Sequence, residues 1–326
     1  MLSLQTKVRI LLLFLSFTIL GALLYFSDIG KVISVISRAN PYYLLLILLI
    51  SFSLMAARTL RWSILLARTR IHIPLRKLFA PYMAGMFVSN LTPGKIGEPI
   101  KSYLLKKTAG VSISKSLPSV FMEKIFDILS AVLLSLVGIV VVTLPENVEV
   151  VLLPVIALYA LATTAVLYVS TRKSRIYWTS KKMMKLLGWL PKIKKLDKSL
   201  EGSVEMFNES MVKYRNAPVT VKNFIISMFI WIAEGVIMYL CFLSVGINVD
   251  ALVVISFLSI AVLIGVTSLL PGGLGSSEVV MVMLFTAAYP LPVYAVTAAV
   301  FMERFFSLWI NIIVGSLCMG LLGKDK

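Results

Sequence analysis

Apolar segments long enough to cross a membrane recur along the whole chain, and they restrict the fold more than any other feature. A spanning helix needs about 20 residues. The six candidate spans are residues 10–26, 41–66, 117–144, 150–170, 223–245 and 293–322. Charged residues make up 14% of the sequence, whereas a soluble domain averages about 25%. Because unpaired backbone groups are not tolerated in a bilayer, we predict an all-α polytopic membrane protein, with residues 1–326 forming a single integral membrane domain.

Two polar stretches rich in Gly and Pro interrupt the apolar sequence, at residues 90–99 and 268–278. They share the pattern Pro-Gly-x-x-Gly. The matched residues are Pro93, Gly94 and Gly97 in the first stretch and Pro271, Gly272 and Gly275 in the second. Proline ends a helix because it lacks an N–H donor, and glycine allows close backbone approach. Each stretch is therefore predicted to break a helix inside the membrane.

A second match follows each break. Phe-Met-Glu occurs at residues 121–123 and again at residues 301–303. Two matched blocks in the same order, at nearly the same separation, indicate an internal duplication. We predict a first repeat over about residues 41–143 and a second over about residues 223–322.

The apolar segments beside the breaks are short. Residues 78–91 and 100–105 flank the first break, and residues 251–270 and 278–289 flank the second. Short segments joined at a break are typical of re-entrant hairpins, which are tolerated where they are buried in protein or line a polar cavity. We predict about six transmembrane helices plus two re-entrant helical hairpins in an inverted repeat. Residues 251–270 are also long enough to be a seventh full span, and this alternative stays open.

The distribution of basic residues predicts the orientation. The segments assigned to the outside, residues 27–40, 145–149, 246–250 and 290–292, together hold two of the 32 Lys and Arg residues. Basic residues concentrate on the cytoplasmic side, so both termini of this multi-pass cell-membrane protein are predicted to be cytoplasmic. The first hairpin then enters from the cytoplasm and the second from outside.

The polar stretch at residues 171–222 is predicted to be a cytoplasmic basic loop. Within it, Leu196, Leu200, Val204, Phe207 and Met211 recur at helical spacing, which predicts an amphipathic helix. Residues 181–190 are expected to lie on anionic lipid as an interfacial segment.

The net charge of +17 is typical of cytoplasmic loops that face anionic headgroups. We therefore expect membrane lipids, and not nucleic acid, as partners. The single histidine, His72, lies in a basic loop, and the two cysteines, Cys241 and Cys318, lie in apolar segments. This composition favours no metal site, no cofactor and no disulfide. We do not expect an enzyme, and the oligomeric state stays open.

Charged residues within membrane segments are energetically costly, so each is a candidate for function. The candidates are Arg58, Arg61, Glu98, Lys101, Glu123, Asp127, Glu234, Glu278, Glu303 and Arg304. Together with the six matched break residues they form the predicted substrate site. The basic groups of the second span and of the first break are expected to hold a phosphate, and the acidic groups to bind a cationic headgroup or carry protons. The alternatives are a buried ion pair at the duplicated positions and snorkelling to the interface for the two arginines of the second span.

These residues carry a resemblance to a known family. The blocks are Arg58-x-x-Arg61-Trp62, Thr92-Pro-Gly-Lys-Ile-Gly-Glu98-x-x-Lys101, Glu123-Lys124-x-x-Asp127 and Pro271-Gly-Gly-Leu-Gly275. They resemble the flippase-like membrane family that includes the transmembrane region of lysylphosphatidylglycerol synthase. The resemblance implies a helical fold with two re-entrant elements and movement of a lipid or lipid-linked headgroup across the bilayer. We do not expect the soluble aminoacyl-transferase domain of the bifunctional members, and Lys101 stands where the family commonly has Arg.

Inverted repeats with broken helices are typical of secondary transporters, whose substrate site lies near the membrane midplane. We therefore expect a transporter or flippase of a polar or anionic lipid or lipid-linked intermediate, working by alternating access around the two breaks. Two alternatives are a non-transporting membrane assembly subunit and a membrane-embedded enzyme acting on lipid phosphates or glycans.

Overall fold

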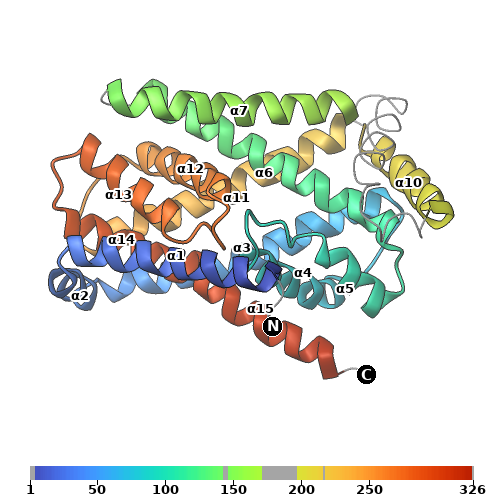
Figure 1. The fold of residues 1–326 in the computed structure, drawn as a ribbon, viewed down its shortest axis with the longest axis horizontal. Coiled ribbons are helices and arrows are strands. Elements are labelled where there is room, and N and C mark those ends of the chain that lie inside the picture. The colour runs from blue at the N-terminus through green and yellow to red at the C-terminus, as the bar shows by residue number, and fades with distance from the viewer. Residues whose placement is uncertain (1–3, 142–145, 171–196, 216, 325–326) are drawn as a thin grey trace.

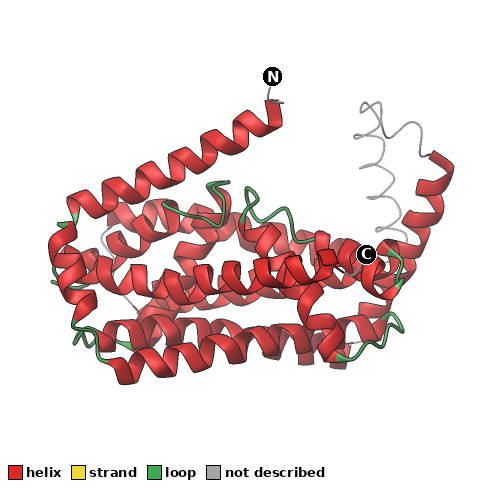
Figure 2. Cartoon of the chain, turned by 90° about the horizontal axis from the view of Figure 1, so that it is seen from below, coloured by secondary structure: helices red, strands yellow, loops and turns green. Residues whose placement is uncertain are grey.

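The computed structural model describes residues 4–141, 146–170, 197–215 and 217–324 (Figure 1). In these ranges every regular element is helical, as Figure 2 shows, so the predicted all-α class is confirmed. The elements are α1 (Leu4–Phe26), α2 (Ile29–Ser37), α3 (Pro41–Arg68), α4 (Leu75–Asn90), α5 (Ile100–Ala109), α6 (Ile113–Val141), α7 (Glu146–Ser170), α10 (Asp197–Val212), η1 (Lys213–Arg215), α11 (Ala217–Ser244), α12 (Ala251–Thr267), α13 (Ser276–Ala288), α14 (Val293–Arg304), η2 (Phe305–Trp309) and α15 (Ile310–Lys324).

Several of these helices are long and apolar enough to cross a bilayer. Among the described residues, the helices that qualify are Pro41–Arg68, Thr220–Ser244 and Val293–Gly323. Ile10–Phe26 of α1 and Ile29–Ser37 of α2 are long and apolar enough only when taken together, and they are bent by 84° at the break between them, as in a broken span or a re-entrant loop. The chain is therefore an integral membrane protein with several apolar spans, and the total of six stays a prediction.

Two helical hairpins lie at opposite ends of the molecule's long axis (Figure 1). α4 and α5 form one, and α12 and α13 form the other. Their connecting loops reach toward each other at the centre, where Pro93 and Pro271 form an isolated antiparallel bridge. The Pro-Gly stretches break the helices as predicted: α4 ends at Asn90 and α12 ends at Thr267. The duplicated Pro-Gly stretches, far apart in the sequence, thus meet in space.

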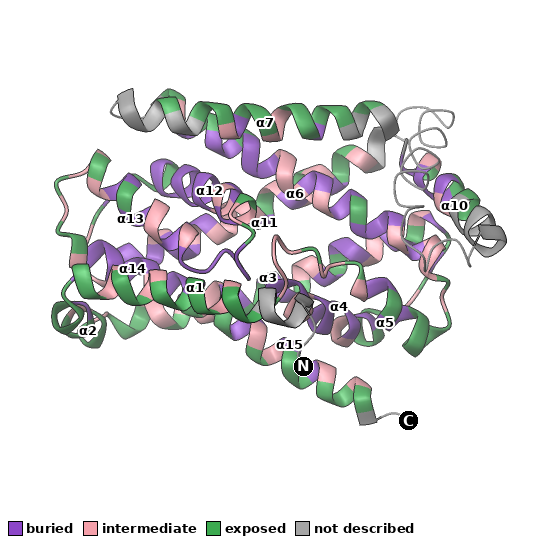
Figure 3. Ribbon diagram, viewed as in Figure 1, coloured by how far each residue is buried: buried purple, intermediate pink, exposed green. Residues whose placement is uncertain are grey.

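The main apolar core surrounds α12. Figure 3 shows buried residues along α12 and exposed ones along much of α1 and α7. Phe285 of α13 packs against Phe242 of α11 and Phe257 of α12, with ring centroids 4.6 and 5.1 Å apart. α12 therefore packs against protein over most of its surface, and its 17 residues fall short of the roughly 20 that a full span needs.

The structure refines several predicted segments. Residues 27–40, assigned to an outside segment, include a nine-residue helix, α2. Asp28 caps this helix by accepting a hydrogen bond from the Lys31 N–H at 3.4 Å. α7 begins at Glu146, so residues 146–149 of the predicted outside turn belong to its first helical turn.

The predicted amphipathic helix is confirmed as α10. Phe207 and Met211 pack in a small cluster with Leu65 of α3. The chain then turns so that the Tyr214 hydroxyl donates to the Leu65 carbonyl at 2.8 Å. The predicted interfacial segment at 181–190 lies outside the described residues.

Candidate functional site

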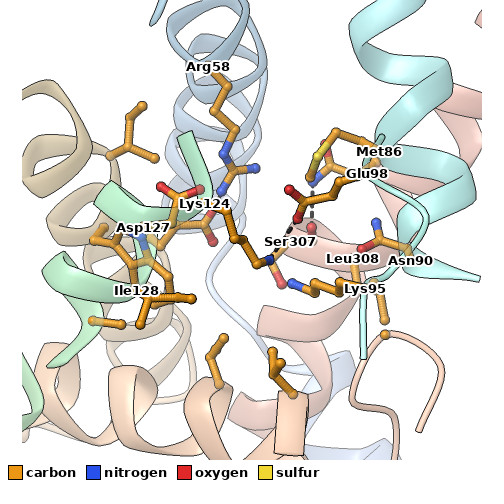
Figure 4. Close-up of a pocket in the computed structure, with 18 of the residues that line it drawn as sticks. Arg58, Met86, Asn90, Lys95, Glu98, Lys124, Asp127, Ile128, Ser307 and Leu308 are labelled. Atoms are coloured by element: carbon orange, nitrogen blue, oxygen red, sulfur yellow. Dashed lines mark hydrogen bonds and ion pairs between the residues drawn. The ribbon is translucent and has the colours of Figure 1, made fainter. Parts of the chain in front are cut away.

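A cavity of about 130 Å³ lies beside the meeting point of the two hairpin loops (Figure 4). Of the described residues, six basic and five acidic side chains line it. The predicted site residues among its lining are Arg58, Arg61, Glu98, Lys101, Glu123, Asp127, Glu234, Gly272, Glu303 and Arg304. The structure thus brings together charges from both predicted repeats, and these charges lie up to 246 positions apart in the sequence.

Arg61 of α3 organises the first group of charges. Its guanidinium donates to Glu123 Oε1 at 2.9 Å and to Asp127 Oδ2 at 3.0 Å, both on α6. It also donates to the Ser227 hydroxyl of α11 at 2.7 Å. A planar guanidinium can make several directed hydrogen bonds at once, so Arg61 ties three helices together. It is 1% exposed, which argues against snorkelling to the interface.

Lys101 of α5 reaches the same carboxylate from the first hairpin. Its ammonium lies 2.7 Å from Glu123 Oε2, and the Tyr82 hydroxyl donates to Glu123 Oε1 at 2.7 Å. The ammonium also lies 4.7 Å from the Tyr82 ring centroid, a favourable cation–π geometry. A Cβ at Gly85 would stand 2.1 Å from Lys101 Cγ, so glycine at this position of α4 makes room for the lysine chain.

Arg58 and Glu234 form a separate ion pair between α3 and α11. Their side chains are 16% and 14% exposed, so the pair faces the cavity without being sealed from it. Arg58, Arg61 and Lys101 were each expected to hold a phosphate. All three line the cavity, and in this structure a carboxylate already balances each of their charges.

Beside each break, an ion pair joins the hairpin to the helix that follows it, and at the first hairpin this pair adds to Lys101–Glu123. Lys124 of α6 contacts Glu98, just after the first break, at 2.7 Å. Arg304 of α14 contacts Glu278, just after the second break, at 2.8 Å. Lys124 and Arg304 occupy matched positions, each directly after the glutamate of a Phe-Met-Glu block. We call these the Lys124–Glu98 and Arg304–Glu278 ties.

The break residues shape the two loops and do not present charge. Gly94 and Gly272 have φ of 58° and 62°, in the left-handed region that glycine adopts without strain. At the start of α13, the Gly275 N–H donates to Glu278 Oε2 at 2.7 Å. The predicted residues Pro93, Gly97, Pro271, Gly275 and Glu278 are not part of the cavity lining, and Gly94 lines a smaller space between the loops.

Sequence reasoning left several lining residues out of the predicted site. Those with a charged, amide or hydroxyl group are Tyr82, Asn90, Lys95, Lys124, Tyr159, Ser307 and Asn311. The sequence could have identified Lys124 as a site residue, because it matches Arg304 in the second Phe-Met-Glu block. Ser307 lies in η2, a π-helical turn, and π-turns inside helices are frequent at functional sites.

No group of three or more His, Cys, Asp or Glu side chains in the described part of the chain is arranged to hold a metal ion. Both cysteines, Cys241 and Cys318, are buried free thiols. The described polar groups that line the cavity are mainly charged side chains, amides and hydroxyls.

The sequence of this chain is similar to a known protein family and to several membrane proteins. The family described as the lysylphosphatidylglycerol synthase TM region matches residues 10–315. A UPF0104 membrane protein of Methanothermobacter thermautotrophicus is 27% identical over 94% of this chain and 93% of its own length. A UPF0104 membrane protein of Methanocaldococcus jannaschii is 25% identical over 100% of this chain and 98% of its own length.

A third such relative, from Pyrococcus horikoshii, is 24% identical over 95% of this chain and 96% of its own length. These relatives match the chain nearly end to end, and the family match runs through both breaks and both Phe-Met-Glu blocks. The chain therefore belongs to the lysylphosphatidylglycerol synthase transmembrane-region family.

Proposed function

We propose that this protein moves a polar or anionic lipid, or a lipid-linked intermediate, across the cell membrane. The observation that carries the proposal is the meeting of two hairpins from opposite ends of the molecule at Pro93 and Pro271, beside a cavity rich in charge. Broken helices that meet near the midplane are the way in which many secondary transporters build a substrate site. The hairpins are then re-entrant, the repeats are inverted and both termini are cytoplasmic.

The two ties suggest how access could alternate. The Lys124–Glu98 tie holds the first hairpin against α6, and the Arg304–Glu278 tie holds the second against α14. Releasing one tie while the other persists would open the cavity toward one side of the membrane only. In this mechanism a headgroup enters the cavity from one leaflet and leaves toward the other, and its acyl chains stay in lipid.

The content of the cavity favours transport over a purely structural role. A non-transporting subunit is expected to fill its centre with large apolar side chains, since a polar interior in a membrane is costly. Here charged side chains from α3, α6, α11 and α14 face a common space. Such an interior stabilises a polar headgroup that would otherwise cross the bilayer core unaided.

The test is lipid translocation in proteoliposomes. A fluorescently labelled anionic phospholipid is placed in both leaflets, and the protected fraction is measured with a membrane-impermeant quencher. We expect Glu98→Gln and Glu234→Gln to slow translocation several-fold, because each leaves a cavity cation without its partner. Glu205→Gln is the matched control, since Glu205 is exposed on α10, far from the ties in sequence and on a different helix.

Three outcomes count against the proposal or a part of it. Wild-type vesicles that scramble lipid no faster than protein-free vesicles would contradict transport and favour an assembly subunit. Unchanged rates in both glutamine variants, with wild-type transport intact, would remove the two carboxylates from the mechanism. Release of a chemically altered lipid over repeated turnovers would instead favour the enzyme alternative.

A further inference from the structure

Lys95 stands apart from the other cations of the cavity. Arg58, Arg61, Lys101, Lys124 and Arg304 each lie within 4 Å of a carboxylate oxygen. Within the described residues, Lys95 has neither an ion pair nor a hydrogen bond from its side chain. Its ammonium therefore contributes the one positive charge of the described lining that no carboxylate contacts.

The backbone at Lys95 is unusual for a residue with a side chain. Its φ is 56°, a left-handed conformation that costs most side-chain-bearing residues roughly 1–2 kcal/mol. The matched residue of the second break is Gly273, with φ of 69°. The two loops share this backbone shape, and only the first carries a cation where glycine would fit without strain. Lysine at this position is therefore not required for the fold.

A second polar group nearby also lacks a partner. Asn90, the last residue of α4, is 4% exposed and lines the same cavity. Its amide makes no hydrogen bond with the part of the chain that the structure describes. The amide oxygen and nitrogen are therefore available to a ligand in the cavity. Figure 4 shows Asn90 beside Lys95 at the edge of the cavity.

The ends of two lysines converge in this space. In Figure 4 the side chains of Lys95 and Lys124 point toward one another. Lys124 has one contact to Glu98, and an ammonium group has three donors. Two neighbouring ammonium groups repel each other unless an anion lies between them. The arrangement offers several donors and an excess of positive charge to an oxyanion.

We propose that Lys95, Lys124 and Asn90 form the subsite that binds the phosphate of the transported lipid. The proposal rests on the transport function above. It centres the phosphate on Lys95, whose charge no carboxylate contacts, and Lys124 adds the donors that its single contact to Glu98 leaves free. Lysine is a common phosphate ligand. Because Lys95 sits at the tip of the first hairpin, phosphate binding would act directly on the loop that contacts Pro271.

The experiment measures binding and not transport. Full-length protein in detergent is titrated by calorimetry with dihexanoyl phosphatidate, and separately with inorganic phosphate. We expect Lys95→Gly to weaken phosphatidate binding about tenfold or more, the factor for losing one hydrogen bond to a charged group. Lys95→Arg should retain most of the affinity, and Lys106→Gln, an exposed lysine of α5, should retain all of it.

Lys95→Gly also separates binding from folding. Glycine adopts the left-handed conformation without strain, so the variant should melt at or above the wild-type temperature while it loses affinity. Undiminished affinity in Lys95→Gly would overturn the proposal, as would a wild-type protein that binds neither probe. Inorganic phosphate that binds as tightly as phosphatidate, with the same loss in Lys95→Gly, would assign the subsite to free phosphate. If Lys95→Gly binds phosphatidate as tightly as the wild type and lipid transport persists, the proposed function still holds but this subsite is wrong.

Discussion

Removing the negative charge of the Glu123 carboxylate should lower the free energy of unfolding substantially. Glu123 is 1% exposed and accepts contacts from Arg61, Lys101 and Tyr82. Glu123→Gln keeps the shape and removes the charge. Lys101, also 1% exposed, then loses its carboxylate, whereas Arg61 keeps Asp127. Breaking a buried pair by removing one partner costs about 3–5 kcal/mol, so we expect a loss of that order.

The compensating variant makes this prediction specific. Replacing Lys101 as well, in the double variant Glu123→Gln with Lys101→Met, removes the stranded ammonium. A well-packed apolar side chain in place of a buried ion is often neutral or better. The double variant should therefore recover most of the loss, with a coupling of at least about 1 kcal/mol between the two positions.

The assay is the free energy of unfolding in mixed micelles, obtained by titration with a denaturing detergent. Glu205→Gln serves as the control for the chemistry of the substitution, because Glu205 is exposed, and surface substitutions usually change stability by less than about 0.5 kcal/mol. The reasoning is refuted if Glu123→Gln is as mild as the control. It is also refuted if the two substitutions are simply additive.

Two further predictions concern topology and packing. If the hairpins enter from opposite sides, Ser112→Cys should react with an impermeant thiol reagent from the cytoplasm and Asn248→Cys from outside. The native Cys241 and Cys318 are buried and should add little background. Reaction of both variants from one side would contradict the inverted arrangement. Gly85→Ala should lower the free energy of unfolding by about 1–3 kcal/mol, because its Cβ would overlap the Lys101 chain. Gly21→Ala, where no atom lies within 4 Å, should be neutral or slightly stabilising, and equal effects of the two would argue against the packing described at Gly85.

The sequence was informative about elements and much less so about contacts. Pro93 and Pro271 marked the ends of the broken helices because proline and glycine act locally. The cost of charge in a membrane segment likewise identified most of the charged side chains that line the cavity. These are properties of one segment at a time, and they can be read without knowing the neighbours.

The pairing of the charges could not be read in that way. Arg61 and Asp127 are 66 positions apart, and Arg58 and Glu234 are 176 apart, so only the packing of α3 against α6 and α11 selects these partners. Lys95 was missed for a related reason. A lysine within a Gly-rich loop has the pattern of a solvated turn, and its position in a central cavity depends on where the whole hairpin docks.

The two ties differ in how much water reaches them. The side chains of Lys124 and Glu98 are 29% and 12% exposed, whereas those of Arg304 and Glu278 are 10% and 1% exposed. Mobile ions screen exposed charge pairs and hardly affect buried ones. A rise in ionic strength should therefore weaken the Lys124–Glu98 tie. It should leave the Arg304–Glu278 tie and the buried Lys101–Glu123 pair nearly unchanged. Although the two ties occupy matched positions in the sequence, they differ in their sensitivity to salt.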